Sequence, residues 1–308
     1  MFLYAHARGE YVILWITKTT PPDTRAKSRI RPCVLTIAGS DSGGNAGVQA
    51  DLRAFHCYGL HGCTAFAALT AQNPRGVRSV LPVPATFLAD QLDAIFEMYA
   101  VKALKTGMLA TPEAIGTVAD RLAAHPRVKK VVDPVMVATS GARLISDEAI
   151  DVLKRRLLPL ATLVTPNLPE TEVLLGRPVA PGEEMRVAAK ELARRFGCAV
   201  LVKGGHAVEA GAARRGGPVR VAEDVLWDGR RLHAFTRPVI AHPVSTHGTG
   251  CSLAAALAAE LARGASLADA VAGAKDFVYE AIRLSYRIGK TCGVLGMPRG
   301  KWGEDCHG

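Results

Sequence analysis

Residues 246–264 read THGTGCSLAAALAAELARG, a glycine-containing turn that leads directly into a helix rich in alanine and leucine. Gly248 and Gly250 carry no side chain, so the backbone at this turn can approach a ligand closely. The free N–H groups of the turn and of the first helical turn, with the positive end of the helix dipole, favour a bound anion. The stretch therefore predicts a site for phosphate or for a transient oxyanion at the start of this helix.

Cys251 lies in the first turn of the same helix. The field at a helix start favours thiolate over thiol and lowers the pKa of a cysteine from about 8.5. We therefore expect a partly ionised sulfur that can act as a base beside the anion. The alternative is a helix cap with a small buried cysteine, because free cysteine is among the most buried residue types. This segment alone leaves both interpretations open.

The composition is that of a folded globular enzyme. With 308 residues, 49% of them hydrophobic and 21% charged, the chain can bury one large core or two smaller ones. The net charge is +10, but residues 1–31 carry six basic and two acidic side chains and so supply +4 of it. The remaining +6 is spread out, without a basic stripe interleaved with aromatic residues, which argues against a nucleic-acid partner. A mildly basic surface suits substrates that carry phosphate.

The seven cysteines are scattered and never form a CxxC pair. This pattern predicts neither a disulfide framework nor a zinc site and favours a reducing compartment, so we expect a cytoplasmic protein. The apolar run at residues 11–16 is much shorter than the roughly 20 residues of a membrane span, and no small-residue cleavage site follows it. We expect no membrane or signal segment, a flexible N-terminal extension at residues 1–31, one domain at residues 32–290 and a tail at residues 291–308.

From residue 33 onward, short β-branched runs alternate with helical patterns. We expect buried strands at residues 33–38, 63–69, 101–107, 128–133, 162–166 and 199–205. Helical patterns lie near residues 47–59, 85–98, 111–124, 147–158, 183–196, 249–262 and 266–285. This alternation predicts a parallel sheet covered by helices on both faces, with ligands at the carboxyl ends of the strands. Residues 221–236 predict a β-hairpin that lies antiparallel at one edge of the sheet.

Each expected strand ends in a polar or glycine-rich loop. After the first strand, the loop GSDSGGNAGVQAD at residues 39–51 contains Asp41 and Asp51 as polar anchors. After the second strand comes Gln72, whose amide offers a donor and an acceptor to the edge of a heterocycle. The later strands end at Lys105 and Met108, at Asp133, at Asn167 and Glu170, and at Lys203.

Several of these residues also have a purely structural interpretation. Asp133 either caps the loop before a helix, or binds Mg²⁺ or shares the role of base. Asn167 and Glu170 either form an N-terminal cap pair of a helix or hold Mg²⁺ and its waters near phosphate. Lys203 is either a surface lysine or a ligand contact, and Met108 is either a core residue or a pocket residue.

Seven motifs follow one another along the chain: GSDSGGNAGVQADL, TAQNPRGV, KTGMLAT, DPVMVATSGARL, LVTPNLPETEVL, LVKGGH and THGTGCSLAAAL. Their order and spacing, as well as their residues, carry a resemblance. Together they closely resemble the hydroxymethylpyrimidine/phosphomethylpyrimidine kinases of thiamine biosynthesis, which belong to the ribokinase-like superfamily. The likeness covers residues 33–288. Most of that superfamily has an aspartate at the end of a GxGD turn, whereas this turn reads GTGC, as in the pyrimidine kinases and some relatives that resemble pyridoxal kinase.

The resemblance implies a three-layer α/β/α sandwich with a mostly parallel central sheet and an antiparallel edge hairpin. It implies an enzyme that uses ATP and Mg²⁺ to phosphorylate 4-amino-5-hydroxymethyl-2-methylpyrimidine and then the monophosphate. We also expect a homodimer. By the resemblance, Gly39, Asp51, Gln72, Met108 and Val135 fall on the pyrimidine pocket, Asp133 and Glu170 on the metal site, and Asn167 and Lys203 beside the nucleotide and its phosphates. The anion hole falls on Gly248, Thr249, Gly250 and Cys251, with Cys251 as the base.

Two other functions stay open at this point. A pyridoxal kinase acts on a similar flat heterocycle with a hydroxymethyl group. A non-catalytic protein that binds a pyrimidine, a nucleotide or nucleic acid predicts binding without release of ADP, and this would leave Cys251, Asp133 and Glu170 without a task.

The chain departs from the family pattern in a few places. Asn45 stands where family members often have glycine, in a loop near the substrate. Asparagine tolerates left-handed dihedral angles better than most residues, so we expect the loop to keep its shape. The resemblance assigns no role to the N-terminal extension, to the insertion GAARRGG at residues 211–217 or to the C-terminal tail.

Overall fold

The computed structural model describes residues 3–7, 10–14, 31–73, 76–136, 144–213, 217–290 and 292–298. The chain divides into two compact units, Met1–Arg31 and Pro32–Gly308. In the first unit, β1 (Leu3–Ala7) and β2 (Glu10–Leu14) pair antiparallel and form a short hairpin that the sequence analysis did not predict. Part of the 211–217 insertion and most of the C-terminal tail lie outside the described residues.

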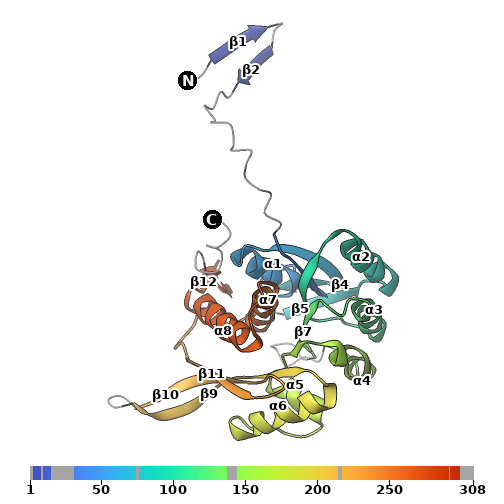
Figure 1. The fold of residues 1–308 in the computed structure, drawn as a ribbon. Coiled ribbons are helices and arrows are strands. Elements are labelled where there is room, and N and C mark those ends of the chain that lie inside the picture. Colours follow the sequence, from blue (N-terminus) through green and yellow to red (C-terminus); the bar gives the residue numbers. More distant parts are fainter. Residues whose placement is uncertain are drawn as a thin grey trace. The chain divides into compact units, whose positions relative to one another are not determined.

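A nine-stranded sheet forms the centre of the second unit, in the order β11-β10-β9-β8-β7-β6-β3-β4-β5 (Figure 1). The six neighbouring strands from β9 to β4 run parallel. At one edge β5 pairs antiparallel with β4, and at the other β10 pairs antiparallel with both β9 and β11. The strands are β3 (Cys33–Gly39), β4 (His61–Asn73), β5 (Gly76–Pro82), β6 (Val101–Thr106), β7 (Lys129–Val132), β8 (Leu163–Val164), β9 (Ala199–Ala213), β10 (Gly217–Trp227) and β11 (Leu232–Pro238).

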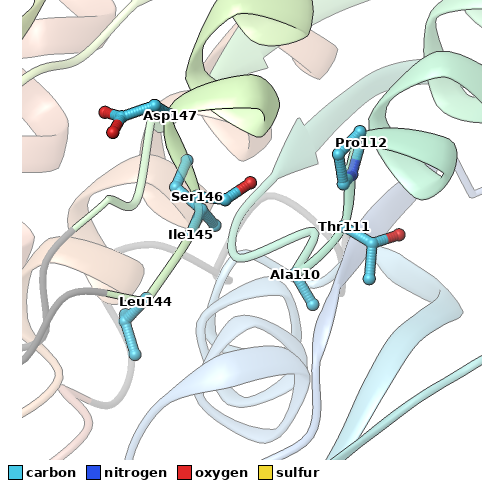
Figure 2. Close-up of a pocket in the computed structure, with 7 residues that line it drawn as sticks. All are labelled: Ala110, Thr111, Pro112, Leu144, Ile145, Ser146 and Asp147. Carbon is cyan, nitrogen blue, oxygen red and sulfur yellow. The ribbon is translucent and has the colours of Figure 1, made fainter.

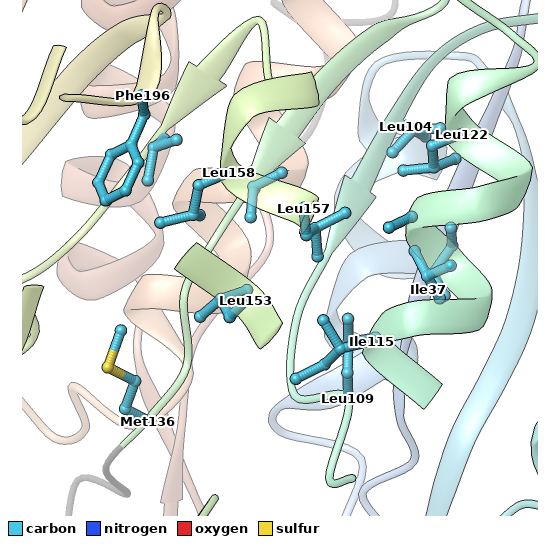
Figure 3. Packing of buried hydrophobic residues seen from close by; sticks show 14 of the residues in the cluster. Ile37, Leu104, Leu109, Ile115, Leu122, Met136, Leu153, Leu157, Leu158 and Phe196 are labelled. Atoms are coloured by element: carbon cyan, nitrogen blue, oxygen red, sulfur yellow. The ribbon is translucent and has the colours of Figure 1, made fainter. Parts of the chain in front are cut away.

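Helices cover both faces of this sheet. Residues from α2 (Ala85–Met98), α3 (Pro112–Ala123), α4 (Asp147–Val152), α5 (Leu168–Leu175) and α6 (Glu183–Phe196) pack in one core cluster. Strand residues of one parity, such as Ile37 and Leu104, belong to this cluster, which Figure 3 shows from close by. We call this side the α3 face.

The opposite side of the sheet packs against α1 (Gly47–Cys57), α7 (Thr249–Ala262) and α8 (Leu267–Arg283). Strand residues of the other parity, such as Val34 and Ala103, belong to this second core, because side chains alternate across a strand. We call this side the α7 face. Two cores around one sheet make the three-layer α/β/α sandwich, so the predicted fold is confirmed.

Most of the expected helices and parallel strands are confirmed to within a few residues, but some elements differ from the prediction. Strand β9, expected at residues 199–205, continues to Ala213. Strand β4 continues to Asn73, and β5 extends the sheet beyond it. The expected helix at 147–158 ends its α-helical part at Val152 and continues as a π-turn and a 3₁₀-turn. Helix α5 begins at the helix start that the sequence analysis placed at Asn167 and Glu170, although no range was predicted for it. The small hairpin of β12 (Tyr286–Ile288) and β13 (Cys292–Val294) was not predicted. Within the part of the chain that the structure describes, no helix combines the length and the apolar character of a membrane span.

Candidate active site

A row of charged side chains with alternating sign lies near the carboxyl ends of the parallel strands. Its members are Asp51, Lys105, Asp133 and Lys203, and we call it the charged row. Ala103 and Leu201 belong to the α7-face core. Lys105 and Lys203 follow them by two positions along their strands, so both lysine side chains project from the same face of the sheet. The start of α7 lies over this part of the sheet, where the sequence predicted an anion site.

Asp51 and Lys105 form a closed ion pair. Lys105 Nζ lies 2.9 Å from Asp51 Oδ2 and 3.1 Å from Oδ1, and Thr36 Oγ1 donates a hydrogen bond of 2.6 Å to Oδ2. Both charged side chains are fully buried. Burial raises the pKa of Asp51, against the effect of Lys105. Burial by itself lowers the pKa of Lys105, but the facing carboxylate raises it above its usual range.

Asp133 and Lys203 form a second ion pair that solvent can reach. Lys203 Nζ donates to Asp133 Oδ1 at 2.7 Å, and Thr165 Oγ1 donates to the same oxygen at 3.1 Å. The Lys203 side chain is 12% exposed. Burial lowers the pKa of Lys203, but the carboxylates of Asp133 and Glu170 raise it above the usual value. A ligand with phosphate can therefore meet a lysine that is charged and already held in place.

The glycine-rich loop after β3 is organised by Asp41, as the sequence predicted. Its carboxylate accepts hydrogen bonds from the backbone N–H groups of Gly43, Asn45 and Ala46 at 2.7 to 2.9 Å. Ser42 in the same loop donates to Gln72 O at 2.7 Å and accepts from Gln72 N at 2.8 Å. These two hydrogen bonds attach the loop to Gln72, which lies in the part of β4 beyond the predicted strand.

The start of α7 packs directly on this loop. Gly248 is the N-cap of α7 and has a φ of +88°, in the left-handed region that favours glycine. A Cβ at this position would lie 2.0 Å from Asn45 O, so no other residue fits the approach. No side chain caps α7, and the place of a Cβ on Gly250 is 3.8 Å from Lys203 Nζ. Uncapped N–H groups and a lysine therefore face the same space.

The expected low pKa of Cys251 is wrong for this structure. Burial raises the pKa of the thiol, and the nearby carboxylates of Asp51 and Asp133 raise it further. The charge of Lys105 and the N–H group of Gly47 act in the opposite direction without reversing the shift. The sequence shows the helix start but does not show that the carboxylates of Asp51 and Asp133 lie near the sulfur.

Asn167 and Glu170 form the N-terminal cap of α5. Asn167 Oδ1 accepts from Glu170 N at 2.8 Å, and Glu170 Oε2 accepts from Asn167 N at 2.9 Å, which is a complete capping box. The structural alternative for this pair is therefore confirmed. Glu170 is buried, and burial raises its pKa to about 7; Lys203 lowers it and Asp133 raises it. With a pKa of about 7, the Glu170 carboxyl can change its protonation state near neutral pH, so it can have a role in addition to capping α5.

The residues that the resemblance places at the pyrimidine are only partly brought together. Gly39 and Met108 are in contact, because a Cβ on Gly39 would lie 2.7 Å from Met108 Cε, and Gly39 N donates to Met108 O at 3.1 Å. Val135 is half-buried two residues after Asp133. Gln72 lies within β4 rather than after it, and its side chain is half-buried. Asp51 is closed to solvent by its pair with Lys105.

A hollow of about 470 Å³ opens beside these elements (Figure 2). It is lined by Ala110, Thr111, Pro112, Leu144, Ile145, Ser146 and Asp147. Figure 2 shows the segment before α3 and the segment before α4 on opposite sides of it. Thr111 and Ser146 already serve as N-caps, accepting from Ala114 N and Ala149 N. None of the predicted site residues lines this hollow.

The carboxylates at the site fit a magnesium ion that arrives with a nucleotide. Among the described residues, no three His, Cys, Asp or Glu side chains lie close enough to hold a metal ion by themselves. Mg²⁺ usually keeps several waters and binds through one or two carboxylates together with substrate phosphates. The charge of Asp133 raises the pKa of Glu170, so two carboxylates lie near each other, the number that such a site takes.

The comparisons with known proteins agree with this geometry. Residues 41–296 match the family model described as phosphomethylpyrimidine kinase. The chain is 47% identical over 265 residues to the thiamine biosynthesis bifunctional protein ThiED of Geobacter sulfurreducens, covering 86% of this chain and 52% of that protein. It therefore spans about half the length of that relative.

Two further relatives are matched over almost their whole length. The chain is 44% identical over 278 residues to the hydroxymethylpyrimidine/phosphomethylpyrimidine kinase of Rhizobium meliloti, covering 88% of this chain and 98% of that one. Its structure is similar to an ADP complex of Bacillus subtilis pyridoxal kinase, with a TM-score of 0.76, 33% identity and coverage of 87% and 98% of the two chains. On the strength of the family model and these identities, the chain belongs to the phosphomethylpyrimidine kinase family.

Proposed function

We propose that this protein transfers the γ-phosphoryl group of ATP to the hydroxymethyl group of 4-amino-5-hydroxymethyl-2-methylpyrimidine, and then a second one to the monophosphate. The observation that carries the proposal is the meeting of the charged row with the uncapped start of α7. Phosphoryl transfer asks mainly for positioning and for stabilisation of negative charge. Lys203 and the N–H groups of residues 249–251 are suited to both.

The chain's own residues have distinct tasks in this mechanism. Lys203 binds the transferred phosphoryl group, and the N–H groups at the start of α7 stabilise the charge that develops on its oxygens. In the first transfer the substrate hydroxyl oxygen forms a bond to the γ-phosphorus, the bond to the ADP oxygen breaks, and the hydroxyl proton leaves. Because the transition state is loose, a nearby acceptor suffices for that proton. Cys251 is the proposed acceptor, through the thiolate fraction that its raised pKa leaves, and Asp133 is the other candidate.

Asp133 and Glu170 would hold Mg²⁺, which neutralises phosphate charge when it is bound with ATP. The second transfer has a different demand. Its nucleophile is an oxygen of the monophosphate, which is already ionised at neutral pH, so no proton has to be removed. A base is therefore needed in only one of the two steps.

The direct test combines purified protein, ATP, Mg²⁺ and the pyrimidine alcohol. We expect release of ADP and the sequential appearance of monophosphate and diphosphate, resolved by ion-exchange chromatography. No turnover of either the alcohol or the monophosphate would overturn the proposal.

A second candidate function is pyridoxal phosphorylation, which the similarity to the Bacillus subtilis pyridoxal kinase favours. Pyridoxal also presents a hydroxymethyl group on a flat heterocycle. Parallel measurements of kcat/KM for the two alcohols decide between them, and we expect the larger value for the pyrimidine.

We also propose that the protein is a cytoplasmic homodimer. Among the described residues no disulfide is formed, in keeping with a reducing compartment. Every residue of the edge strand β5 is exposed, including the large hydrophobic side chains of Val77, Val80 and Leu81, and the exposed Leu69 of β4 pairs with Leu81. An edge strand with free N–H and C=O groups can pair antiparallel with its own copy about a two-fold axis. Sedimentation velocity should give a dimer for the wild type and a monomer for Val80→Lys; a monomeric wild type would contradict this.

A further inference from the structure

A third buried ion pair, which does not belong to the charged row, lies next to Lys203. Lys275 on α8 and Asp224 on β10 are each 9% exposed, and Lys275 Nζ lies 2.5 Å from Asp224 Oδ2. The other oxygen, Asp224 Oδ1, accepts a hydrogen bond of 3.0 Å from Gly204 N. Gly204 directly follows Lys203, so the pair is linked to the active site through one backbone N–H group.

That N–H group belongs to a bulge in β9. Lys203 is paired with Asp224 and Ala207 with Ala222, so residues 204–206 stand opposite the single residue Glu223. A Cβ on Gly204 would lie only 2.1 Å from Glu223 O, so the two backbones touch at this point. The Asp224 carboxylate thus supplies an acceptor to the bulge at the residue where β9 and β10 fall out of register.

The position of Lys203 depends on where the bulge begins. Its backbone is held on the other side by the hydrogen bond from Lys203 N to Pro166 O at 2.8 Å. Its ammonium group bonds to Asp133 and lies near Gly250. A shift of the bulge by even a fraction of an ångström moves this ammonium group relative to the start of α7.

We infer that Asp224 and Lys275 are positioning residues for Lys203. Asp224 fixes the start of the bulge through the Gly204 N–H group, and Lys275 neutralises Asp224 so that its carboxylate can stay buried. Neither residue touches the substrates. The inference rests on the proposed function, in which Lys203 binds the transferred phosphoryl group.

Two double variants separate the hydrogen bond from the charge. In Asp224→Asn with Lys275→Met, both charges are gone but the amide oxygen still accepts from Gly204. In Asp224→Leu with Lys275→Met, both charges and the acceptor are gone. Replacing a whole buried ion pair by neutral groups of similar volume is often tolerated, so both proteins should fold.

We expect the Asn/Met variant to keep kcat/KM for ATP within about threefold of the wild type. We expect the Leu/Met variant to lose about 10- to 100-fold, the scale of a displacement of up to 1 Å at a catalytic group. In both, KM for the pyrimidine should stay within about twofold, because the effect acts through Lys203. A merely structural role would lower the yield of folded protein and would leave these ratios unchanged.

Glu223→Gln is the matched control. Glu223 is the neighbour of Asp224 on β10, but its side chain bonds to Arg186 on α6 at 2.8 Å, on the α3 face. This variant should retain wild-type kinetics.

Equal kcat/KM values for ATP in the two double variants would overturn the inference. So would a loss in both of them that follows the fall in Tm. A failure of the proposed function is seen separately, as a wild type that releases no ADP. In that case the affinity for ADP, measured by calorimetry, still decides: weaker binding in the Leu/Met variant alone supports the inference, and equal binding overturns it.

Discussion

The two ion pairs of the charged row have the same chemistry but different access to solvent. Asp51 and Lys105 are both 0% exposed, whereas Asp133 is 4% exposed and Lys203, which faces the start of α7, is 12% exposed. A pair that no ligand can reach has a structural and electrostatic role. A pair at the mouth of a site can exchange its carboxylate for a phosphate. The difference implies that similar substitutions affect the folding of the protein at one pair and catalysis at the other.

The largest effect is expected at the closed pair. Lys105→Met leaves the carboxylate of Asp51 buried without its cation, which typically costs about 3–5 kcal/mol of stability. Urea unfolding at pH 7 measures this loss. The double variant Asp51→Asn with Lys105→Met removes both charges and should recover most of the stability. A single variant as stable as the wild type would show that the pair contributes nothing.

At the open pair we expect the loss in turnover instead. Lys203→Met should lower kcat by about 10²- to 10³-fold, the usual cost of removing one group that stabilises transition-state charge. Asp133 is buried, so some stability is lost too, but this loss should be smaller than at Asp51 because Lys203 is partly exposed and Asp133 keeps its hydrogen bond from Thr165. Steady-state kinetics and Tm together check this. Lys130→Met is a control, since Lys130 is buried too but, among the described residues, donates to the carbonyl oxygens of His125 and Val128 rather than to a carboxylate.

The role of the Cys251 sulfur can be tested by comparing the rates of the two phosphorylations. Cys251→Ser should slow the first transfer by about 10²-fold, the scale of a lost general base. The second transfer, which needs no proton removed, should slow by less than about tenfold. Single-turnover measurements with the alcohol and with the monophosphate give both numbers.

Equal slowing of both steps would assign Cys251 to the anion hole rather than to proton transfer. Near-normal rates in both would move the role of base to Asp133. Cys198→Ser is the control, because Cys198 lies at the amino end of β9, away from the site.

The sequence is sufficient to predict the α/β/α sandwich and the end of the sheet that holds the site. Buried β-branched runs alternating with helices predict the parallel sheet, and its carboxyl edge brings Asp133, Asn167 and Lys203 together. The pairing of Asp51 with Lys105 could not be predicted, because the two residues are 54 positions apart and meet only when α1 packs on β3, the strand next to β6. The prediction also missed β5, because an edge strand exposed along its whole length has no alternating hydrophobic pattern.

The burial of individual side chains was the property that could least be predicted from the sequence. The helix start at Cys251 is visible in the sequence, but the direction of its pKa shift depends on solvent access. Thr36 and Thr165 were missed as partners of the two acids for a related reason, because threonine is a common strand residue. The bulge after Lys203 was marked by two glycines, yet the residue that fixes it lies on another strand.

We expect the stability of the protein to depend on pH because of Glu170, which lies near the Asp133–Lys203 pair. Burial raises its pKa from about 4.5 to about 7, so the folded protein binds more protons than the unfolded chain between these values. The contribution of this group to stability is therefore greatest below pH 4.5 and is lost as the pH rises through 7. We expect a loss on the order of 2 kcal/mol between pH 5 and pH 8, measured by urea unfolding. In Glu170→Gln this part of the dependence should vanish; an unchanged pH profile would show that Glu170 titrates normally.

The smallest effect concerns the cap of α5 and separates the two roles of Glu170. Glu170→Ala removes the acceptor for Asn167 N, whereas Glu170→Gln keeps an oxygen there, since glutamine also completes a capping box. At pH 5 the carboxyl is mostly neutral, so charge contributes little and the cap is measured alone. We expect Glu170→Ala to lower the free energy of unfolding by about 1 kcal/mol and Glu170→Gln to change it by less than about 0.5 kcal/mol. If both variants nevertheless lose turnover equally at pH 8, the carboxylate serves the reaction as well as the helix; if only Glu170→Ala loses it, the cap is the whole role.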